Sequence, residues 1–184
     1  MKDSVERDGG EVARLRVGDA QSWEALYRRV YPAMLAYAER RLGSKEEAQD
    51  AVSESMTRTV SGMDRLAETG ATPESWLFGV LRHVVLDRQR SSYRRRDLPV
   101  HRDLTPDGPL ESVVVGDERD AVRAAFDNLP DRDRELLELR VVAGLSSEEV
   151  ASILDMQPGA VRTAQARALD KLRSVLAWSE EVVS

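Results

Sequence analysis

The sequence of 184 residues contains no cysteine and only two histidines, His83 and His101. Disulfide bonds and cysteine-based zinc sites are therefore excluded. Neither histidine belongs to a metal-ligand motif such as H-E-x-x-H, no phosphate-binding glycine loop is present, and no serine has a recognisable general base. These absences predict a protein that is not an enzyme and that uses no metal ion or other cofactor.

Long apolar runs are also missing. No stretch approaches the length of a membrane span, and residues 1–10 are charged and contain no apolar signal region. The sequence therefore predicts a cytoplasmic protein that does not insert into a membrane by itself. Aromatic residues are scarce at 5%, whereas 41% of residues are hydrophobic and 33% are charged, which suits helical cores in one large or two small domains.

The most informative segment is GLSSEEVASILDMQPGAVR at residues 144–162. Ser146 and Glu149 form the capping-box pattern S-x-x-E, so a helix is expected to begin directly after Ser146. Pro158 suits the first position of a second helix, where its missing N–H removes no hydrogen bond. The small residue Ala151 lies where two steeply crossed helices approach each other. The segment therefore predicts a DNA-binding helix-turn-helix.

The net charge of −6 is unevenly distributed along the chain. Residues 82–102 carry seven arginines against two aspartates, a net charge of +5, whereas residues 103–156 carry a net charge of −9. Local basic patches, rather than net charge, mark the binding of phosphates. We expect the acidic remainder to prevent strong DNA binding by the free chain, which indicates that a partner is needed.

The apolar residues recur at helical spacing throughout, and no segment alternates as a strand would. We therefore expect an all-α fold of two small helical domains joined by a flexible acidic linker, with the helix-turn-helix in the second domain. Proline and glycine punctuate the linker and replace the helical pattern there. The expected boundaries are a mostly disordered tail at 1–17 with a helical turn at 11–17, a first domain at 18–96, the linker at 97–116 and a second domain at 117–184.

Start and stop signals place the individual helices. In the first domain, Asp19, Ser44 and Thr72 are expected to cap three helices, the last of which reaches residue 93. Pro32 should kink or split the first helix. Residues 62–71 should form a loop. In the second domain, helices are expected at 117–128, 131–143, 147–154 and 158–178.

These parts together resemble the small, two-domain extracytoplasmic-function (ECF) subfamily of bacterial RNA polymerase sigma factors, over residues 13–175. The motifs that carry the resemblance are Gly18-Asp19-Ala20, Glu47 to Glu54, Pro73 to Phe78 running into Asp87 to Arg90, Leu129-Pro130, Gly144-Leu145-Ser146 and Val161-Arg162. The resemblance implies a protein that binds core RNA polymerase and directs it to specific promoters for transcription initiation. It also implies control by an anti-sigma protein, which would hold the chain at the membrane when the chain is not at the nucleoid.

The resemblance assigns residues to three binding faces. One face would dock on the polymerase core and comprises Asp50, Ser53, Glu54 and Arg58. The basic helix of the first domain would read the minus-ten element with Arg82, His83, Arg90, Arg94, Arg95 and Arg96. Loop 62–71 would capture an unstacked base of the melted non-template strand. The linker would thread the polymerase channel.

The third face follows from the geometry of the helix-turn-helix, whose second helix would read the minus-thirty-five element in the major groove of duplex DNA. Its candidate residues are Pro158, Arg162, Thr163, Gln165, Arg167 and Lys171. Arg162 is the best candidate for a bidentate contact either to guanine, whose edge offers two acceptors that a guanidinium matches, or to a close pair of phosphates. Arg167 and Lys171, farther along the helix, are expected to contact phosphates.

Two other classes of protein remain open. A conventional helix-turn-helix regulator would bind duplex DNA without polymerase, and as a dimer it would prefer a palindromic site. An adaptor would bind only proteins, which the two basic segments argue against. Promoter-specific transcription by core polymerase, measured with and without the chain, separates all three classes.

Overall fold

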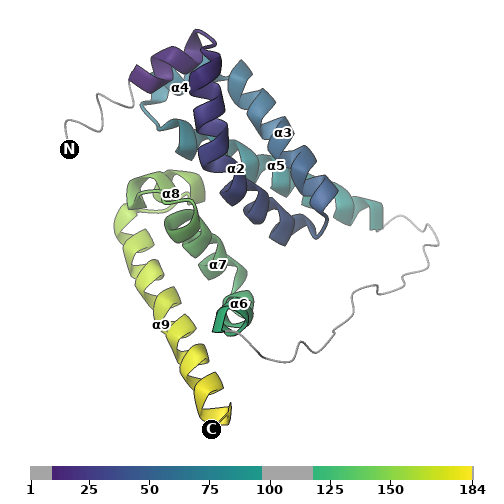
Figure 1. Ribbon diagram of the computed structural model, residues 1–184, viewed down its shortest axis with the longest axis vertical. Helices are drawn as coiled ribbons and strands as arrows, with labels where there is room; N and C mark the ends of the chain where they lie inside the picture. Colours follow the sequence, from purple (N-terminus) through teal and green to yellow (C-terminus); the bar gives the residue numbers. More distant parts are fainter. Residues whose placement is uncertain (1–9, 97–117, 184) are drawn as a thin grey trace.

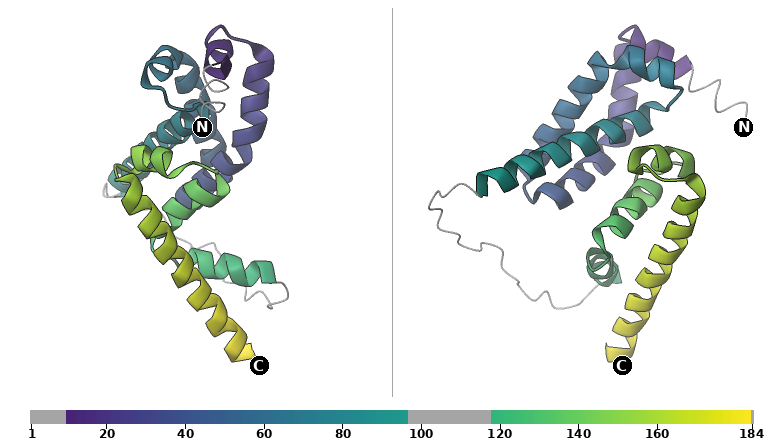
Figure 2. Two further views of the ribbon diagram at one scale, coloured as in Figure 1. Left: turned by 90° about the vertical axis from the view of Figure 1, so that its left-hand side faces the viewer. Right: turned by 180° about the vertical axis from the view of Figure 1, so that it is seen from behind.

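A computed structural model describes residues 10–96 and 118–183, and the expected linker at 97–116 lies outside these ranges. Within the two ranges all regular structure is helical, which confirms the all-α prediction (Figures 1 and 2). No helix in them is long and apolar enough to cross a membrane. Because the segment between them is not described, the boundaries of the linker stay predictions.

The N-terminal domain consists of α2 (Ala20–Leu42), α3 (Lys45–Ser61), α4 (Met63–Thr69) and α5 (Pro73–Arg96). Helices α2, α3 and α5 pack against one another in pairs, and α5 crosses behind α2 and α3 in the view of Figure 1. Their facing sides are apolar and fully buried, as expected for amphipathic helices around one core. The largest buried side chains of this core are Leu26, Met34, Val52, Leu66, Leu77, Leu81, Val84 and Val85.

The expected caps of this domain are present. Asp19 Oδ2 accepts a hydrogen bond from Ser22 N at 2.9 Å, and Ser44 Oγ accepts one from Glu47 N at 3.3 Å. Thr72 Oγ1 accepts one from Ser75 N at 3.2 Å. These bonds satisfy backbone donors that the first turn of each helix would otherwise leave unpaired. Local sequence signals therefore define where these helices begin.

Helix α2 continues through Pro32 and is not split there. Proline removes one backbone hydrogen bond and disturbs the preceding turn. Val30 before it and Met34 and Tyr37 after it are all buried in the same core, so both halves of the helix are held by packing. Tertiary contacts therefore outweigh the local penalty.

One expectation for the N-terminal domain is wrong. Residues 62–71 contain the short helix α4, because Met63 and Leu66 are buried in the core. Helix α4 is too short to show a helical period, so only its packing reveals it. The helical turn expected at 11–17 is present at residues 10–16, where Leu15 is 1% exposed and its carbonyl accepts a hydrogen bond from Trp23 Nε1 at 3.0 Å.

The C-terminal domain consists of α6 (Glu118–Asp127), α7 (Asp131–Leu137), the π-helical turn η1 (Glu138–Val142), α8 (Ser147–Leu154) and α9 (Pro158–Val183). The single helix expected at 131–143 is therefore α-helical in its first part and π-helical in its last turn. In that turn the N–H of Ala143 donates to the carbonyl of Glu138, five residues earlier, at 2.8 Å. Gly144, with a φ of +71°, then ends the helix. Helix α9 continues to Val183 instead of ending at 178.

Helices α8 and α9 form the predicted helix-turn-helix. The capping box is complete, because Ser146 Oγ accepts from Glu149 N at 3.2 Å and Glu149 Oε2 accepts from Ser146 N at 2.7 Å. Val150, Ala151 and Val161 are buried where the two helices cross. A small residue at this crossing lets the backbones approach closely, as the sequence predicts.

We expect Ser146→Ala to lower the free energy of unfolding of the C-terminal domain by about 1 kcal/mol, because it removes the side-chain acceptor of the cap. Thermal unfolding followed by circular dichroism measures the change. Ser152→Ala, an exposed position on the same helix, is the matched control. Equal stability of the two variants would contradict a stabilising role for the cap.

Candidate nucleic-acid interface

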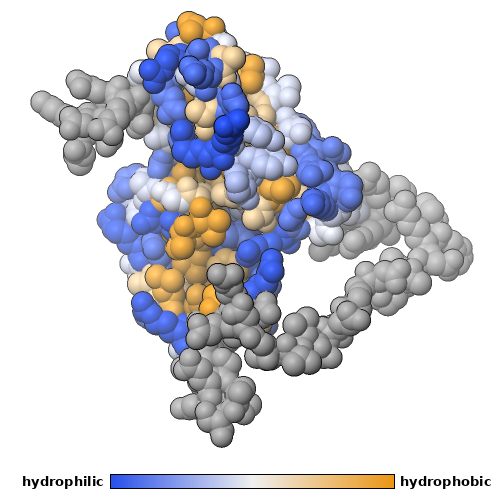
Figure 3. Space-filling view, in the orientation of Figure 1, coloured by the Kyte–Doolittle hydropathy of each residue, from blue (hydrophilic) through white to orange (hydrophobic). Residues whose placement is uncertain are grey.

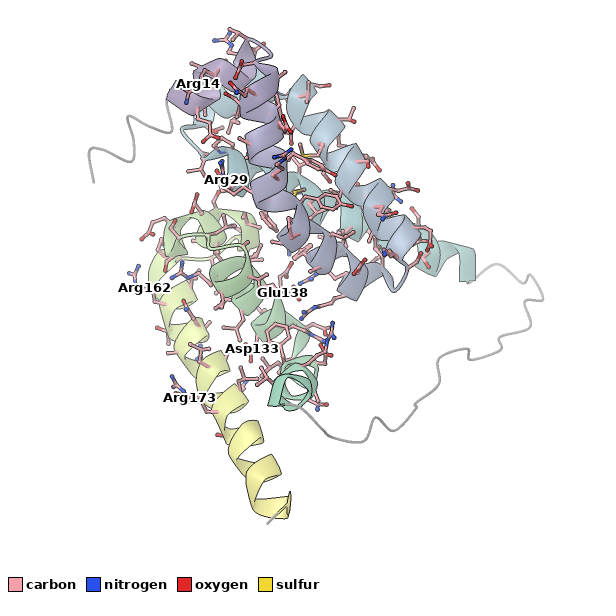
Figure 4. The ribbon with its side chains drawn as sticks, in the orientation of Figure 1. Arg14, Arg29, Asp133, Glu138, Arg162 and Arg173 are labelled. Atoms are coloured by element: carbon pink, nitrogen blue, oxygen red, sulfur yellow. The ribbon has the colours of Figure 1, made fainter. Side chains whose placement is uncertain are left out.

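The outer side of α9 carries the first group of candidate DNA contacts. Arg162 has 60% of its side chain exposed, and its guanidinium lies 3.3 Å from the carboxylate of Glu148 on α8. Figure 4 shows Arg162 and Arg173 projecting from the outer side of α9, away from α7. Thr163 and Arg167 are also exposed on this helix. The exposed guanidinium groups can reach phosphates and base edges without rearrangement of the domain.

Two other candidates on α9 are turned toward its own domain. The side-chain oxygen of Gln165 accepts a hydrogen bond from Arg140 Nε at 2.8 Å. Lys171 Nζ donates to Asp133 Oδ2 of α7 at 2.5 Å. Pro158 is half-buried at the first position of α9. Gln165 and Pro158 are therefore packed against their own domain, while Lys171, like Arg162, is ion-paired within the domain and still has more than half of its side chain exposed.

The sequence did not single out Arg140 and Arg173. Arg140 also donates to the carbonyl of Leu145, so it joins η1, the start of the helix-turn-helix and α9. No sequence signal marks this function, because it depends on the contact with Gln165. Arg173 lies 11 residues after Arg162, and this separation returns a side chain to the same face of an α-helix. That spacing could have identified Arg173.

The polar residues of α5 lie on two sides of the helix, because successive residues are rotated by about 100°. His83, Asp87 and Arg90 are exposed on one side, and Arg90 Nη1 lies 3.6 Å from Asp87 Oδ1. The ring Nδ1–H of His83 donates to the carbonyl of Gly79 at 2.7 Å, which leaves Nε2 for other partners. Arg82 lies on the other side, toward the C-terminal domain, and pairs with Glu135.

Arg94, Arg95 and Arg96 occupy the end of α5, but their side chains lie outside the described part of the chain. Their predicted contact with the minus-ten element stays a prediction. Among the α5 candidates whose side chains are described, His83 and Arg90 are the two on the exposed side of the helix.

A cleft of about 500 Å³ opens beside His83, between the two domains. Trp76, Gly79 and His83 line it from the N-terminal domain, and Glu149 and Ser152 line it from α8 of the C-terminal domain. Its lining is mostly apolar, with a few polar groups, which suits the flat faces of a base. The cleft adjoins the end of α4, where the sequence expected a base-capturing loop.

Helix α3 carries the candidate face for the polymerase core. Asp50 and Ser53 are exposed, whereas the carboxylate of Glu54 accepts hydrogen bonds from Arg88 Nη2 at 2.9 Å and Arg58 Nη2 at 2.6 Å. The hydrogen bond from Arg88, with the positive charge of Arg58, holds the pKa of Glu54 below its usual range. Glu54 therefore stays ionised and fixed in position on the surface of the helix.

We expect Arg88→Met to lower the free energy of unfolding at neutral pH by less than about 1 kcal/mol, because the pair is partly exposed. A carboxyl with a lowered pKa stabilises the folded state above its usual pKa, and this contribution is lost as the pH falls through the lowered value. The difference between the variant and the parent should therefore shrink in acid. Urea unfolding at about pH 7 and about pH 3 measures it.

The matched control is Arg28→Met, which removes an exposed ion pair with Glu24 four residues earlier on α2. A loss for Arg88→Met that is equal at both pH values would mean that Arg88 acts by packing and not by its charge.

Two family models match the chain: Sigma-70 region 2 at residues 26–95 and Sigma-70 region 4 at residues 119–172. The ECF RNA polymerase sigma factor ShbA of Streptomyces griseus is 34% identical over 179 residues, which cover 91% of this chain and 94% of the relative. The chain belongs to the extracytoplasmic-function family of RNA polymerase sigma factors. The ECF sigma factor SigD of Mycobacterium tuberculosis is 31% identical to this sigma factor over 176 residues, covering 91% and 83% of the two chains.

Two solved structures share the fold of this sigma factor. CnrH in complex with the cytosolic domain of CnrY matches with a TM-score of 0.62 and 22% identity, over 92% of this sigma factor and 97% of the solved chain. RpoE of Bartonella quintana, in complex with the anti-sigma factor NepR, matches with a TM-score of 0.63 and 22% identity, over 85% and 98%. The two-domain helical architecture is thus shared at low sequence identity.

Membership of the family decides between the classes that the sequence left open. The sigma factor is a transcription initiation factor that binds core RNA polymerase and directs it to promoters. Its two matched regions coincide with the two helical domains, and the helix-turn-helix lies within region 4.

Proposed function

We propose that this sigma factor positions core polymerase by holding the promoter at two points, one in each domain. The outer face of α9, with Arg162, Thr163 and Arg167, would enter the major groove at the minus-thirty-five element. The face of α5 with His83 and Arg90 would hold the edge of the minus-ten element. The observation that carries the proposal is that both faces expose basic side chains on helices of separate domains.

The cleft beside His83 extends the proposal to the melted strand. An unstacked base of the non-template strand would enter between Trp76 and His83, where an aromatic face and a ring nitrogen are available. In this proposal Asp87 orients Arg90 instead of touching DNA, since a carboxylate near phosphates is repelled. The exposed face of α3 around Asp50, Ser53, Glu54 and Arg58 would bind the polymerase core.

The proposal gives the chain no catalytic step, because the polymerase supplies the chemistry of RNA synthesis. The chain would act in the cytoplasm, at the nucleoid. An anti-sigma protein would control it, and the support for this partner is the family and the shared fold with RpoE, which was solved with the anti-sigma factor NepR. When the chain is isolated from unstressed cells, a second protein should co-purify with it, and this protein should suppress transcription when it is added to the purified system. If no such protein co-purifies, the proposed control by an anti-sigma protein is contradicted.

Transcription in a purified system tests the central proposal. Core polymerase with the chain should start RNA at defined promoter positions, whereas core polymerase alone should not. Purified chain should also co-migrate with core polymerase on gel filtration. A chain that binds duplex DNA tightly without polymerase, and gives no promoter-dependent start with it, would instead be a conventional regulator.

A further inference from the structure

The inner side of α9 is an apolar stripe that Gln165 interrupts. Val161 and Ala168 are fully buried, and the half-buried Gln165 lies between them at a spacing that places all three on one side of an α-helix. Apolar side chains gather on the C-terminal domain where α9 packs on α7, and they form orange surface in Figure 3. A polar side chain turned toward such a seam requires a hydrogen-bond partner within its own domain.

Arg140 of η1 is that partner. Its Nε donates to the side-chain oxygen of Gln165 at 2.8 Å, and its Nη1 donates to the carbonyl of Leu145. Leu145 is buried and directly precedes Ser146, the N-cap of α8. A guanidinium is a planar fork with donors in fixed directions, so it holds two acceptors at a set spacing. Arg140 therefore ties α9 to the turn from which α8 starts.

This bond fixes the rotation of α9 about its own axis. Successive residues of an α-helix are rotated by about 100°, so Thr163, two residues before Gln165, lies about 160° around the helix from it. By the same rule Arg162, three residues before Gln165, lies about 60° away. Thr163 and Arg162 are both exposed. Contacts to base edges tolerate only small displacements, so they depend on how far the helix is rotated.

We propose that Arg140 and Gln165 are a positioning pair for promoter reading. Gln165 does not contact DNA; held by Arg140, it sets the rotation at which α9 presents Arg162 and Thr163 to the minus-thirty-five element. This inference rests on the proposed function, and it gives Gln165 a different role from the DNA contact expected from the sequence. Base discrimination should depend on the pair more than total affinity does, because phosphate contacts carry no sequence information.

The discrimination is measured on the complex of the chain with core polymerase. The parent complex first selects its preferred sequence from promoter DNA that is randomised over the minus-thirty-five segment. The discrimination is the ratio of the affinities for this sequence and for a scrambled one, at a temperature where circular dichroism shows a folded chain. A variant that only unfolds more easily loses both affinities equally and keeps the ratio, because one folded fraction multiplies both.

Arg140→Met and Gln165→Leu should each lower the discrimination by at least about fivefold, the value of a weak but specific base contact. The double variant should lose no more than Arg140→Met alone, because both changes break the same bond. Arg140→Lys keeps the charge, but a single ammonium group does not hold two acceptors in a fixed geometry, so it should also lose discrimination. Arg132→Met, at an exposed position of α7, is the control and should keep the parent's ratio. Losses that multiply in the double variant would overturn the pairing.

Gln165→Glu separates positioning from direct contact. Its carboxylate accepts the same hydrogen bond from Arg140, so the discrimination and the affinity should stay within about twofold of the parent's. Ala166→Glu adds the same negative charge on the exposed side of α9 and should weaken promoter binding, because the charge repels phosphates. If Gln165→Glu weakens binding as much as Ala166→Glu does, Gln165 contacts DNA and the positioning pair is wrong.

The two proposals fail in distinguishable ways. If the parent complex selects a minus-thirty-five sequence, and Arg140→Met and Gln165→Leu keep its discrimination, the positioning pair is wrong and the DNA contact of α9 stands. If the parent complex selects no sequence from the randomised segment, the proposed minus-thirty-five contact fails, and the positioning pair fails with it.

Discussion

Replacing Arg162 with alanine is expected to weaken promoter binding by the polymerase complex by roughly fivefold to 150-fold, the loss of one good base contact. The guanidinium is exposed on the outer face of α9, and its neighbour Glu148 orients it from 3.3 Å without burying it. Affinity for core polymerase should be unchanged, because the proposed core-binding face lies on α3 in the other domain. Electrophoretic mobility shift on promoter DNA and gel filtration with core polymerase measure the two affinities separately.

Arg132→Ala is the matched control, since Arg132 is an exposed arginine of the same domain on α7. It removes the same charge from the domain but leaves the α9 face intact, so promoter binding should stay near that of the parent. Equal loss of promoter and polymerase binding in Arg162→Ala would show that Arg162 supports folding instead of contacting DNA.

Leu81→Ala should lower the free energy of unfolding of the N-terminal domain by about 2–5 kcal/mol. Leu81 is fully buried on α5, in the core where α5 meets α2 and α3, so truncation removes apolar contacts and leaves a cavity. A loss of this size is a large part of the stability of a small domain. Urea unfolding is followed by tryptophan fluorescence in a Trp178→Phe background, so that the signal comes from Trp23 and Trp76, which both lie in this domain.

Leu86→Ala on the same helix is the control, because Leu86 is only half-buried and lies outside the core. It should shift the midpoint of unfolding much less than Leu81→Ala does. A similar shift for both variants would mean that the helical propensity of α5, and not its buried face, determines the stability of the domain.

The sequence predicted the parts of the fold that local chemistry determines. Asp19, Ser44, Thr72 and Ser146 each cap the helix that they were expected to cap, because a cap depends only on the next three residues. The sequence did not predict the segment whose structure depends on packing with distant parts of the chain. Helix α4 was expected to be a loop because it is short, and Leu66 stabilises it through its burial in the core.

The sequence likewise predicted some features of the candidate site and missed others. The helical period predicts which side chains lie on the outer face of a helix, so the sequence alone could predict that Arg162 is exposed. The inward bonds of Gln165 and Lys171 were not, because their partners Arg140 and Asp133 come from other helices. The pairing of Arg82 with Glu135, 53 residues later in the chain, needs the docking of two domains.

The π-helical turn at Glu138–Val142 serves two surfaces at once. Glu138 binds arginines of the N-terminal domain, while Arg140, two residues later, holds Gln165 and the carbonyl of Leu145 at the helix-turn-helix. A π-helical turn contains one residue more than an α-helical turn. Deleting the residue between Glu138 and Arg140 would restore an α-helical turn and make these two residues neighbours, about 100° apart around the helix axis. The wide turn thus sets the angle between the side chain that meets the N-terminal domain and the side chain that braces the helix-turn-helix, so relatives that keep both contacts should preserve the length of this segment more strictly than its residue types.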